Sequence, residues 1–242
     1  MRCVFAVLLV AALTTGCATS KDPEAVAQND PYESTNRAIF DFNMKIDRAV
    51  AKPAAKFYNH AVPPFARNGL HNFLTNLDKP VTLGNDMLQA NGPRVGETLS
   101  RFAVNTTLGV GGLVDVATMM GIPDHTEDFG QTLGTWGVGE GPYLVLPFMG
   151  PDPPRDIGGD VVDIFMDPLT YIRFHASDTW YAVRSGVSVI DLRARNVDSL
   201  DQIERTSIDF YATTRSLYRQ YRNAEIRNGQ PDAGDDIDTP NY

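Results

Sequence analysis

The sequence predicts an all-α fold, a single domain of amphipathic helices with at most one short hairpin near residues 138–148. Apolar residues recur at helical spacing in several separate segments of the chain. Prolines, or residues suited to helix capping, stand where most of these segments begin. The stretch "GTWGVGEGPYLVLPFMGPD" departs from this pattern, and its flanking glycines and prolines favour a hairpin there.

Three helices are expected in the first part of the domain. One covers residues 34–50 and begins at a Ser34 or Thr35 cap. A second covers residues 64–77, because Pro63 and Pro64 stand where a first helical turn tolerates proline. Pro80 is expected to open a separate short helix over residues 81–89.

Three further helices are expected beyond Pro93. The first covers residues 94–109 and has an apolar stripe that includes Val95, Leu99 and Phe102. The second covers residues 179–196. The third is one long helix over residues 199–226.

The N-terminus has the features of an export signal. Arg2 precedes an apolar run that ends at Leu13, too short for the roughly 20 residues that a membrane span needs. Small residues before Cys17 indicate a lipoprotein signal peptide over residues 1–16, although Thr14 stands where an apolar residue is usual. The alternative is a plain signal peptide that contains a cysteine.

Lipoprotein processing predicts a division of the remaining chain. Cys17 would carry S-diacylglycerol and N-palmitoyl groups, and two or more acyl chains anchor a protein stably. Residues 17–29 form a polar tether, 30–228 the domain, and 229–242 an acidic tail expected to be disordered. Ala18, rather than Asp, favours the outer membrane over retention in the inner one.

Composition excludes several classes of function. Removing residues 1–16 takes away Arg2 and no acid, so the net charge changes from −9 to −10, which disfavours nucleic acid as a partner. The same cleavage removes Cys3, leaving one cysteine and therefore no internal disulfide or CxxC site.

Two segments are unusually apolar. Residues 107–122 contain one charged residue, Asp115, and residues 143–149 contain none. Each segment is explained either by an ordinary core or by contact with lipid in a membrane interface. Their occurrence in one lipid-anchored chain favours lipid contact.

No catalytic or metal-binding constellation stands out. The glycines around Gly109 and Gly137 lack the GxGxxG spacing, and no GxSxG surrounds a serine such as Ser185 or Ser188. The four histidines are scattered. "DHTED" (124–128) is explained by a solvated helix N-terminus or by weak cation binding. In "RDIGGDVVD" (155–163), Asp156, Asp160 and Asp163 share one helix face beside Arg155, forming either a wet surface or an acid–base pair.

Five blocks of sequence, in order, resemble the MlaA (VacJ) family of outer-membrane lipoproteins. They are "DPYESTNRAIFDFN", "VPPFARNGLHNFLTNLDKP", "RFAVNTTLGVGGLVDVA", "DFGQTLGTWGVGEGPYLVLPFMGP" and "RDIGGDVVD". The resemblance covers nearly all of residues 30–228.

The resemblance implies a helical ring in the inner leaflet of the outer membrane, surrounding an amphipathic lipid channel and held by porin trimers. Such a protein removes mislocalised phospholipids from the outer leaflet and passes them to a periplasmic carrier. It is not an enzyme and needs no cofactor. The alternatives are a lipid-anchored phospholipase and a structural scaffold that binds porin.

Channel and hinge candidates follow from this resemblance. Gly137, Gly139 and Gly141 are candidates for a hinge, because glycine bends the backbone at low cost. The other candidates are Phe42, Asn43, Arg155, Asp156 and Asp160.

Overall fold

The computed structural model describes residues 23–172 and 177–228. It confirms the all-α prediction, with a single two-stranded sheet among the described residues. The signal peptide 1–16, the lipidation site Cys17 and the tail 229–242 lie outside the described residues. Within the segment expected to be a tether, residues 23–27 form a short helix, α2 (Pro23–Ala27).

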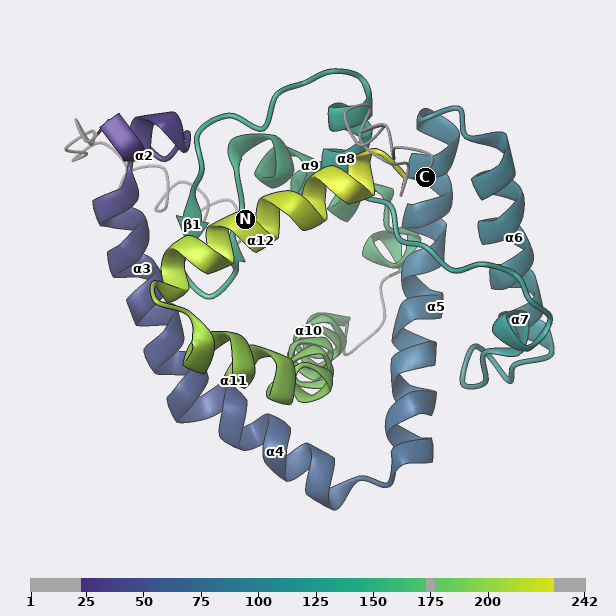
Figure 1. The fold of residues 1–242 in the computed structure, drawn as a ribbon. Helices are drawn as coiled ribbons and strands as arrows, with labels where there is room; N and C mark the ends of the chain where they lie inside the picture. The colour runs from purple at the N-terminus through teal and green to yellow at the C-terminus, as the bar shows by residue number, and fades with distance from the viewer. Residues whose placement is uncertain (1–22, 173–176, 229–242) are drawn as a thin grey trace, which may run out of the picture.

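The first long element is a continuous helical run along the left and lower edges of Figure 1. It comprises α3 (Glu33–Ile46), a π-helical turn η2 (Asp47–Ala51) and α4 (Lys52–Ala61). The run therefore extends beyond the expected end at residue 50. The wider π turn ends two residues before Pro53, which has no N–H to donate to the preceding turn.

The next helix, α5 (Pro64–Leu88), passes through Pro80 without a break. The prediction of two helices separated at Pro80 is therefore wrong. Contacts on the N-terminal side of Pro80 hold the helix: Asn76 donates to the Thr106 hydroxyl, and Lys79 donates to Asp124 and to the His125 carbonyl. These tertiary contacts offset the hydrogen bond that proline removes.

The chain then forms α6 (Gly92–Thr107), α7 (Val116–Met119) and α8 (Phe129–Thr135). Three side chains cap them: Asn91 accepts from Arg94 N, Asp115 from Thr118 N, and Asp128 from Gln131 N.

The expected hairpin exists but lies a few residues later than 138–148. Strands β1 (Val145–Leu146) and β2 (Gly150–Pro151) pair antiparallel, with Leu146 opposite Gly150. Phe148 in its turn has a positive φ of 67°, and Gly150, the first residue of β2, has a positive φ of 91°. Glycine adopts this left-handed conformation easily, so the chain can reverse direction within the apolar segment 143–149.

The C-terminal part contains α9 (Pro154–Met166), the 3₁₀ turn η3 (Pro168–Tyr171), α10 (Ser177–Arg195), α11 (Val197–Thr206) and α12 (Phe210–Ile226). The single helix expected over 199–226 is wrong. Ser207 is extended, and Asp209 caps α12 by accepting from Ala212 N, so the chain turns between two helices. In Figure 1, α10 and α11 lie inside the frame made by α3–α4, α5 and α12.

Burial in this domain is unusual, because buried polar and charged side chains outnumber buried hydrophobic ones among the described residues. The largest hydrophobic cluster is small and consists of Phe40, Tyr143, Val145 and Tyr211. Many large apolar side chains are exposed instead, including Phe57, Phe65 and Leu108. None of the described helices has the length and apolar character needed to cross a membrane.

The burial of polar side chains and the exposure of apolar ones are clearest on α6. Its buried residues are Thr98, Arg101 and Asn105, whereas Leu99, in the expected apolar stripe, is 52 % exposed. The periodicity identified the helix correctly, but the buried face is the polar one, and the apolar stripe is exposed at Leu99 and half-buried at Val95 and Phe102. An outward apolar face is expected where the surroundings are not water.

Candidate functional site

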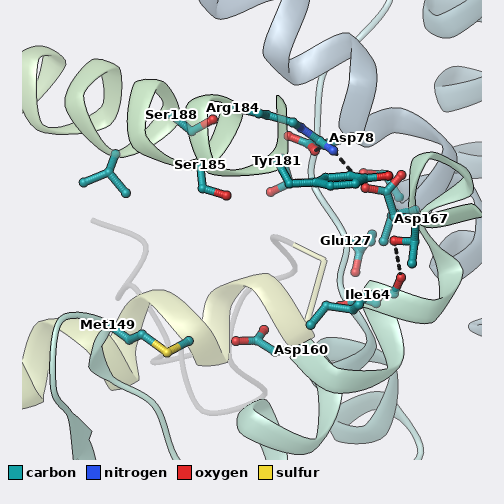
Figure 2. A pocket seen from close by; sticks show the side chains of 16 residues that line it. Asp78, Glu127, Met149, Asp160, Ile164, Asp167, Tyr181, Arg184, Ser185 and Ser188 are labelled. Carbon is teal, nitrogen blue, oxygen red and sulfur yellow. Dashed lines mark hydrogen bonds and ion pairs between the residues drawn. The ribbon is translucent and has the colours of Figure 1, made fainter. Parts of the chain in front are cut away.

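A cavity of about 740 Å³ opens between α5, α9 and α10 (Figure 2). Its wall combines apolar and charged side chains. The apolar ones include Val81, Met149, Ile164 and Val189, and the carboxylates are Asp78, Glu127, Asp160, Asp163 and Asp167.

Four of the five carboxylates accept hydrogen bonds from neighbouring groups. Asp163 accepts from Asn85 Nδ2 and from Phe129 N, each at 2.9 Å. Glu127 accepts from Gln89 and is paired with Arg94. Such donors stabilise the charged form of a carboxylate inside a protein.

The other two carboxylates that have partners, Asp78 and Asp167, share one guanidinium, that of Arg184. Arg184, on α10, donates to Asp167 at 2.9 Å and to Asp78 at 2.5 Å. It therefore joins α10 to α5 and to the end of α9 across the cavity, as the dashed line in Figure 2 shows for one of these contacts.

Asp160 differs from the other carboxylates of the cavity. No described residue donates a hydrogen bond to it or forms an ion pair with it. Reduced hydration, together with the nearby carboxylates Asp128 and Asp163, raises its pKa to about 6. Of the channel candidates named from the sequence, only Asp160 lines the cavity.

The wall formed by α10 was not expected from the sequence. Tyr181, Arg184, Ser185 and Ser188 all project from this helix toward the cavity (Figure 2). Ser185 and Ser188 were considered above as nucleophiles only. No short-range sequence signal identifies this wall, since it faces residues of α5 and α9 that are far away in the chain.

Arg155 and Asp156 lie away from the cavity lining, in a buried ion-pair network. Asp156 accepts from Arg155 at 2.9 Å and from Arg222 at 3.0 Å, and it also accepts from the Tyr218 hydroxyl. Burial opposes ionisation of Asp156, but Arg155 and Arg222 outweigh it and lower its pKa. The network fixes α9 against α12.

The same network depends on close packing of α8 on α9. A Cβ added to Gly159 would lie 2.3 Å from the backbone nitrogen of Gly130. Glycine at both positions allows the two helices to touch. The Asp–x₃–Asp spacing on α9 therefore serves two environments, with Asp156 in the buried network and Asp160 on the cavity wall.

The three candidate hinge glycines differ in conformation. Gly137 and Gly141 have positive φ of 90° and 78°, whereas Gly139 does not. Both Gly137 and Gly139 have open space where a Cβ would lie. The conformation thus explains glycine at 137 and 141, and a hinge role for the three residues stays a prediction.

The segment after these glycines is held firmly by asparagines. The Asn36 side chain donates to the Tyr143 carbonyl and accepts from Val145 N. Asn43 repeats this pattern two turns further along α3, donating to the Leu146 carbonyl at 2.8 Å and accepting from Phe148 N at 2.8 Å. Asn43 therefore fastens the hairpin to α3.

Phe42 meets the hairpin from the adjacent position of α3. Its ring lies edge-on to Phe148, with 5.4 Å between centroids. Phe148 is 75 % exposed, and the next residue, Met149, lines the cavity. Phe42 and Asn43 thus connect α3 to the cavity edge through the hairpin.

The "DHTED" segment leads into a helix N-terminus, as expected, but Glu127 and His125 within it are not solvated. Asp124 is paired with Lys79 and Arg101, and His125 contacts Asp86 and the Thr98 hydroxyl in a buried cluster. Asp128 caps α8 and accepts from Arg222. Among the residues that the structure describes, no group of three or more His, Cys, Asp and Glu is placed to hold a metal ion.

The apolar segment 107–122 exposes its large side chains. Leu108 is 66 % exposed and Met119 is 77 % exposed, whereas Asp115 is paired with Arg101 at 2.9 Å. The single charge of the segment therefore points inward. An ordinary hydrophobic core does not explain this segment.

Comparison with known proteins gives a consistent family. Residues 28–225 match the family model "MlaA lipoprotein". The chain is 35 % identical to "Intermembrane phospholipid transport system lipoprotein MlaA" of Haemophilus influenzae, over 95 % of this chain and 92 % of that protein. It is 38 % identical to the protein of the same name in Escherichia coli, over 93 % of this chain and 88 % of that protein.

A solved structure agrees with these relatives. It is described as "Structural basis for maintenance of bacterial outer membrane lipid asymmetry" and is 38 % identical in sequence, with a TM-score of 0.73. The match covers 81 % of this chain and 98 % of that one. The chain therefore belongs to the MlaA lipoprotein family.

Proposed function

We propose that this protein removes mislocalised phospholipids from the outer leaflet of the outer membrane and passes them to a periplasmic lipid carrier. This transport between membranes maintains lipid asymmetry, and no covalent bond is made or broken. The names of the relatives and of the solved structure support this function.

The observation that carries the proposal is the amphipathic cavity inside a domain with an apolar exterior. A phospholipid needs a polar surface for its headgroup and an apolar one for its acyl chains, and the cavity wall supplies both. Exposed apolar side chains around the domain suit a position within one leaflet, where no spanning helix is required.

The proposed location is the periplasmic side of the outer membrane, with diacylglycerol and palmitate on Cys17 as the anchor and porin trimers as neighbours. Cys17→Ala is expected to abolish lipidation and to leave the chain uncleaved or mislocalised. Mass spectrometry of the mature wild-type N-terminus tests the anchor, and an unmodified terminus contradicts it.

A hydrolase is the alternative of a different class. It requires an activated nucleophile, and Ser185 and Ser188 are the serines that line the cavity. Within the described chain neither serine hydrogen-bonds to a histidine or carboxylate. A porin-binding scaffold that moves no lipid is the third candidate.

Cavity narrowing tests the transport function. Val189 and Val183 lie on the same helix with similar exposure, 59 % and 52 %, but only Val189 lines the cavity. In cells that lack the native protein, Val189→Trp should leave several-fold more phospholipid in the outer leaflet than Val183→Trp does, at equal protein abundance.

The lipid products separate the three candidates. Intact phospholipid that leaves the outer leaflet supports transport, and lyso-phospholipid or free fatty acid indicates a hydrolase. If Val189→Trp behaves like the wild-type protein, the cavity is not the lipid passage.

A further inference from the structure

We propose that the cavity selects phospholipids whose headgroup carries an ammonium group, as phosphatidylethanolamine does, and that Asp160 receives this group. The inference rests on the proposed function, because it names which phospholipid the cavity takes. It follows from the charges of the wall, from the unpaired state of one carboxylate and from the neutral donors on the opposite side.

The charge balance of the wall is strongly negative. Five carboxylates and one guanidinium line it. Arg184 is paired with Asp78 and Asp167, and Glu127 is paired with Arg94 from outside the lining, so Asp160 and Asp163 remain without an ion-pair partner among the described residues. A ligand with a net negative headgroup would add to this repulsion. A ligand with an exposed cation would reduce it.

Asp160 is the carboxylate best placed to receive the cation. Asp163 and Glu127 already accept hydrogen bonds from protein groups, whereas Asp160 accepts none from the described residues. Partial burial and the nearby carboxylates Asp128 and Asp163 raise its pKa. An ammonium group has three donors and would form charge-assisted hydrogen bonds with the free carboxylate.

The α10 side of the cavity offers uncharged hydrogen-bond donors, in contrast to the carboxylate acceptor Asp160. Ser185 and Ser188 are three residues apart, so their side chains share one face of the helix, and Figure 2 shows them across the cavity from Asp160. Their hydroxyls make no hydrogen bond with any described residue. They are available to a phosphate oxygen.

Neutral hydroxyls make this arrangement selective. A free arginine or lysine would attract every phospholipid through its phosphate, including those with no cationic group. On the phosphate side Arg184 is already engaged by Asp78 and Asp167, so the hydroxyls are the free donors and the carboxylate on the other side decides between headgroups. The apolar side chains Met149, Ile164 and Val189 remain for the acyl chains.

The test measures which phospholipid the full-length, lipidated protein holds in its cavity. The protein is equilibrated with vesicles of equal parts phosphatidylethanolamine and phosphatidylglycerol with identical acyl chains. Native mass spectrometry then counts bound phospholipid, and the portion lost in Val189→Trp is assigned to the cavity. Phosphatidylethanolamine should exceed phosphatidylglycerol about five-fold in this portion.

Two substitutions and one control locate the preference. Asp160→Asn should bring the ratio close to one, and Asp160→Lys should reverse it in favour of phosphatidylglycerol. Asp198→Asn is the matched control, since Asp198 is an exposed aspartate on α11 outside the cavity. The control should keep the wild-type ratio.

The possible failures are distinguishable. Equal amounts of the two lipids in the wild-type cavity overturn the headgroup inference and leave the transport function standing. A preference that persists in Asp160→Asn overturns the role of Asp160. The absence of any phospholipid sensitive to Val189→Trp overturns the transport proposal and this inference together.

Discussion

Two regions of the molecule bury opposite kinds of side chain. Where α3 and α12 meet the hairpin, the rings of Phe40, Tyr143 and Tyr211 form a hydrophobic cluster. Where α5, α6 and α7 meet, most of the buried residues are polar, and Arg101 is paired with Asp115. Leu99 and Leu108 face outward there.

The difference indicates two kinds of surroundings for one domain. The aromatic cluster is the core expected of a protein folded in water. The α5–α7 region pairs its charges internally and exposes its apolar side chains, as membrane-embedded segments do. Substitutions that disrupt each region separately test two alternatives. In one the domain faces lipid, and in the other it is water-soluble with an incomplete hydrophobic core.

The largest expected effect is in the polar region. Arg101→Leu removes bonds to Asp115, Thr118 and the Ile122 carbonyl and leaves a carboxylate without its counter-charge. We expect a loss of about 3–5 kcal/mol in the free energy of unfolding, measured by denaturant titration in detergent micelles. A loss below about 1 kcal/mol would mean that the buried charges do not organise this region.

A comparable substitution tests the aromatic cluster. Phe40→Ala removes a ring that packs against Phe210 and Tyr211. The free energy of unfolding should fall by about 3 kcal/mol in the same titration. As a control, Leu99→Ser on the outer face of α6 should change it little in micelles but weaken partitioning into vesicles.

A pH-dependent effect is expected beside the cavity. Asp152 is buried, and burial together with the nearby Asp160 and Asp156 raises its pKa to about 7. A raised folded-state pKa means that stability is lost as the pH rises from about 4 through 7. Asp152→Asn should therefore raise the free energy of unfolding by about 2 kcal/mol at pH 8, with little difference at pH 4. Equal effects at both pH values would contradict this assignment.

The smallest effects concern the glycines before the hairpin. Gly137→Ala and Gly141→Ala place a side chain at positive φ and should each cost about 1 kcal/mol, whereas Gly139→Ala should be nearly neutral. Outer-leaflet phospholipid measured against protein abundance decides between hinge and turn. If lipid accumulates only in proportion to lost abundance, these are turn glycines.

Sequence periodicity predicted the helices but not which face each would bury. It assigned Leu99 to the apolar stripe of its helix, and such a stripe is buried only when the surroundings are water. It also separated α5 at Pro80 and missed the break at Ser207, since contacts from Lys79 and the cap at Asp209 decide these points.

The candidate site was predictable only in part. Asp160 was found because its helix face is visible as a local pattern in the chain. The remaining walls come from residues such as Asp78 and Arg184, which are 106 positions apart and meet only in the folded domain. The resemblance to a family supplied the functional class, but it did not indicate the unpaired state of Asp160.

The accessibility of spin labels tests most directly whether the exposed apolar face of the α5–α7 region contacts lipid. A nitroxide attached at position 99, through Leu99→Cys, is compared with one at position 198, through Asp198→Cys, in the membrane-inserted protein. Oxygen, which dissolves in lipid, should relax the label at 99 strongly, and a water-soluble nickel chelate should relax the label at 198. If the chelate reaches position 99 as readily as position 198, the exposed apolar face is in water and the proposed membrane position is wrong.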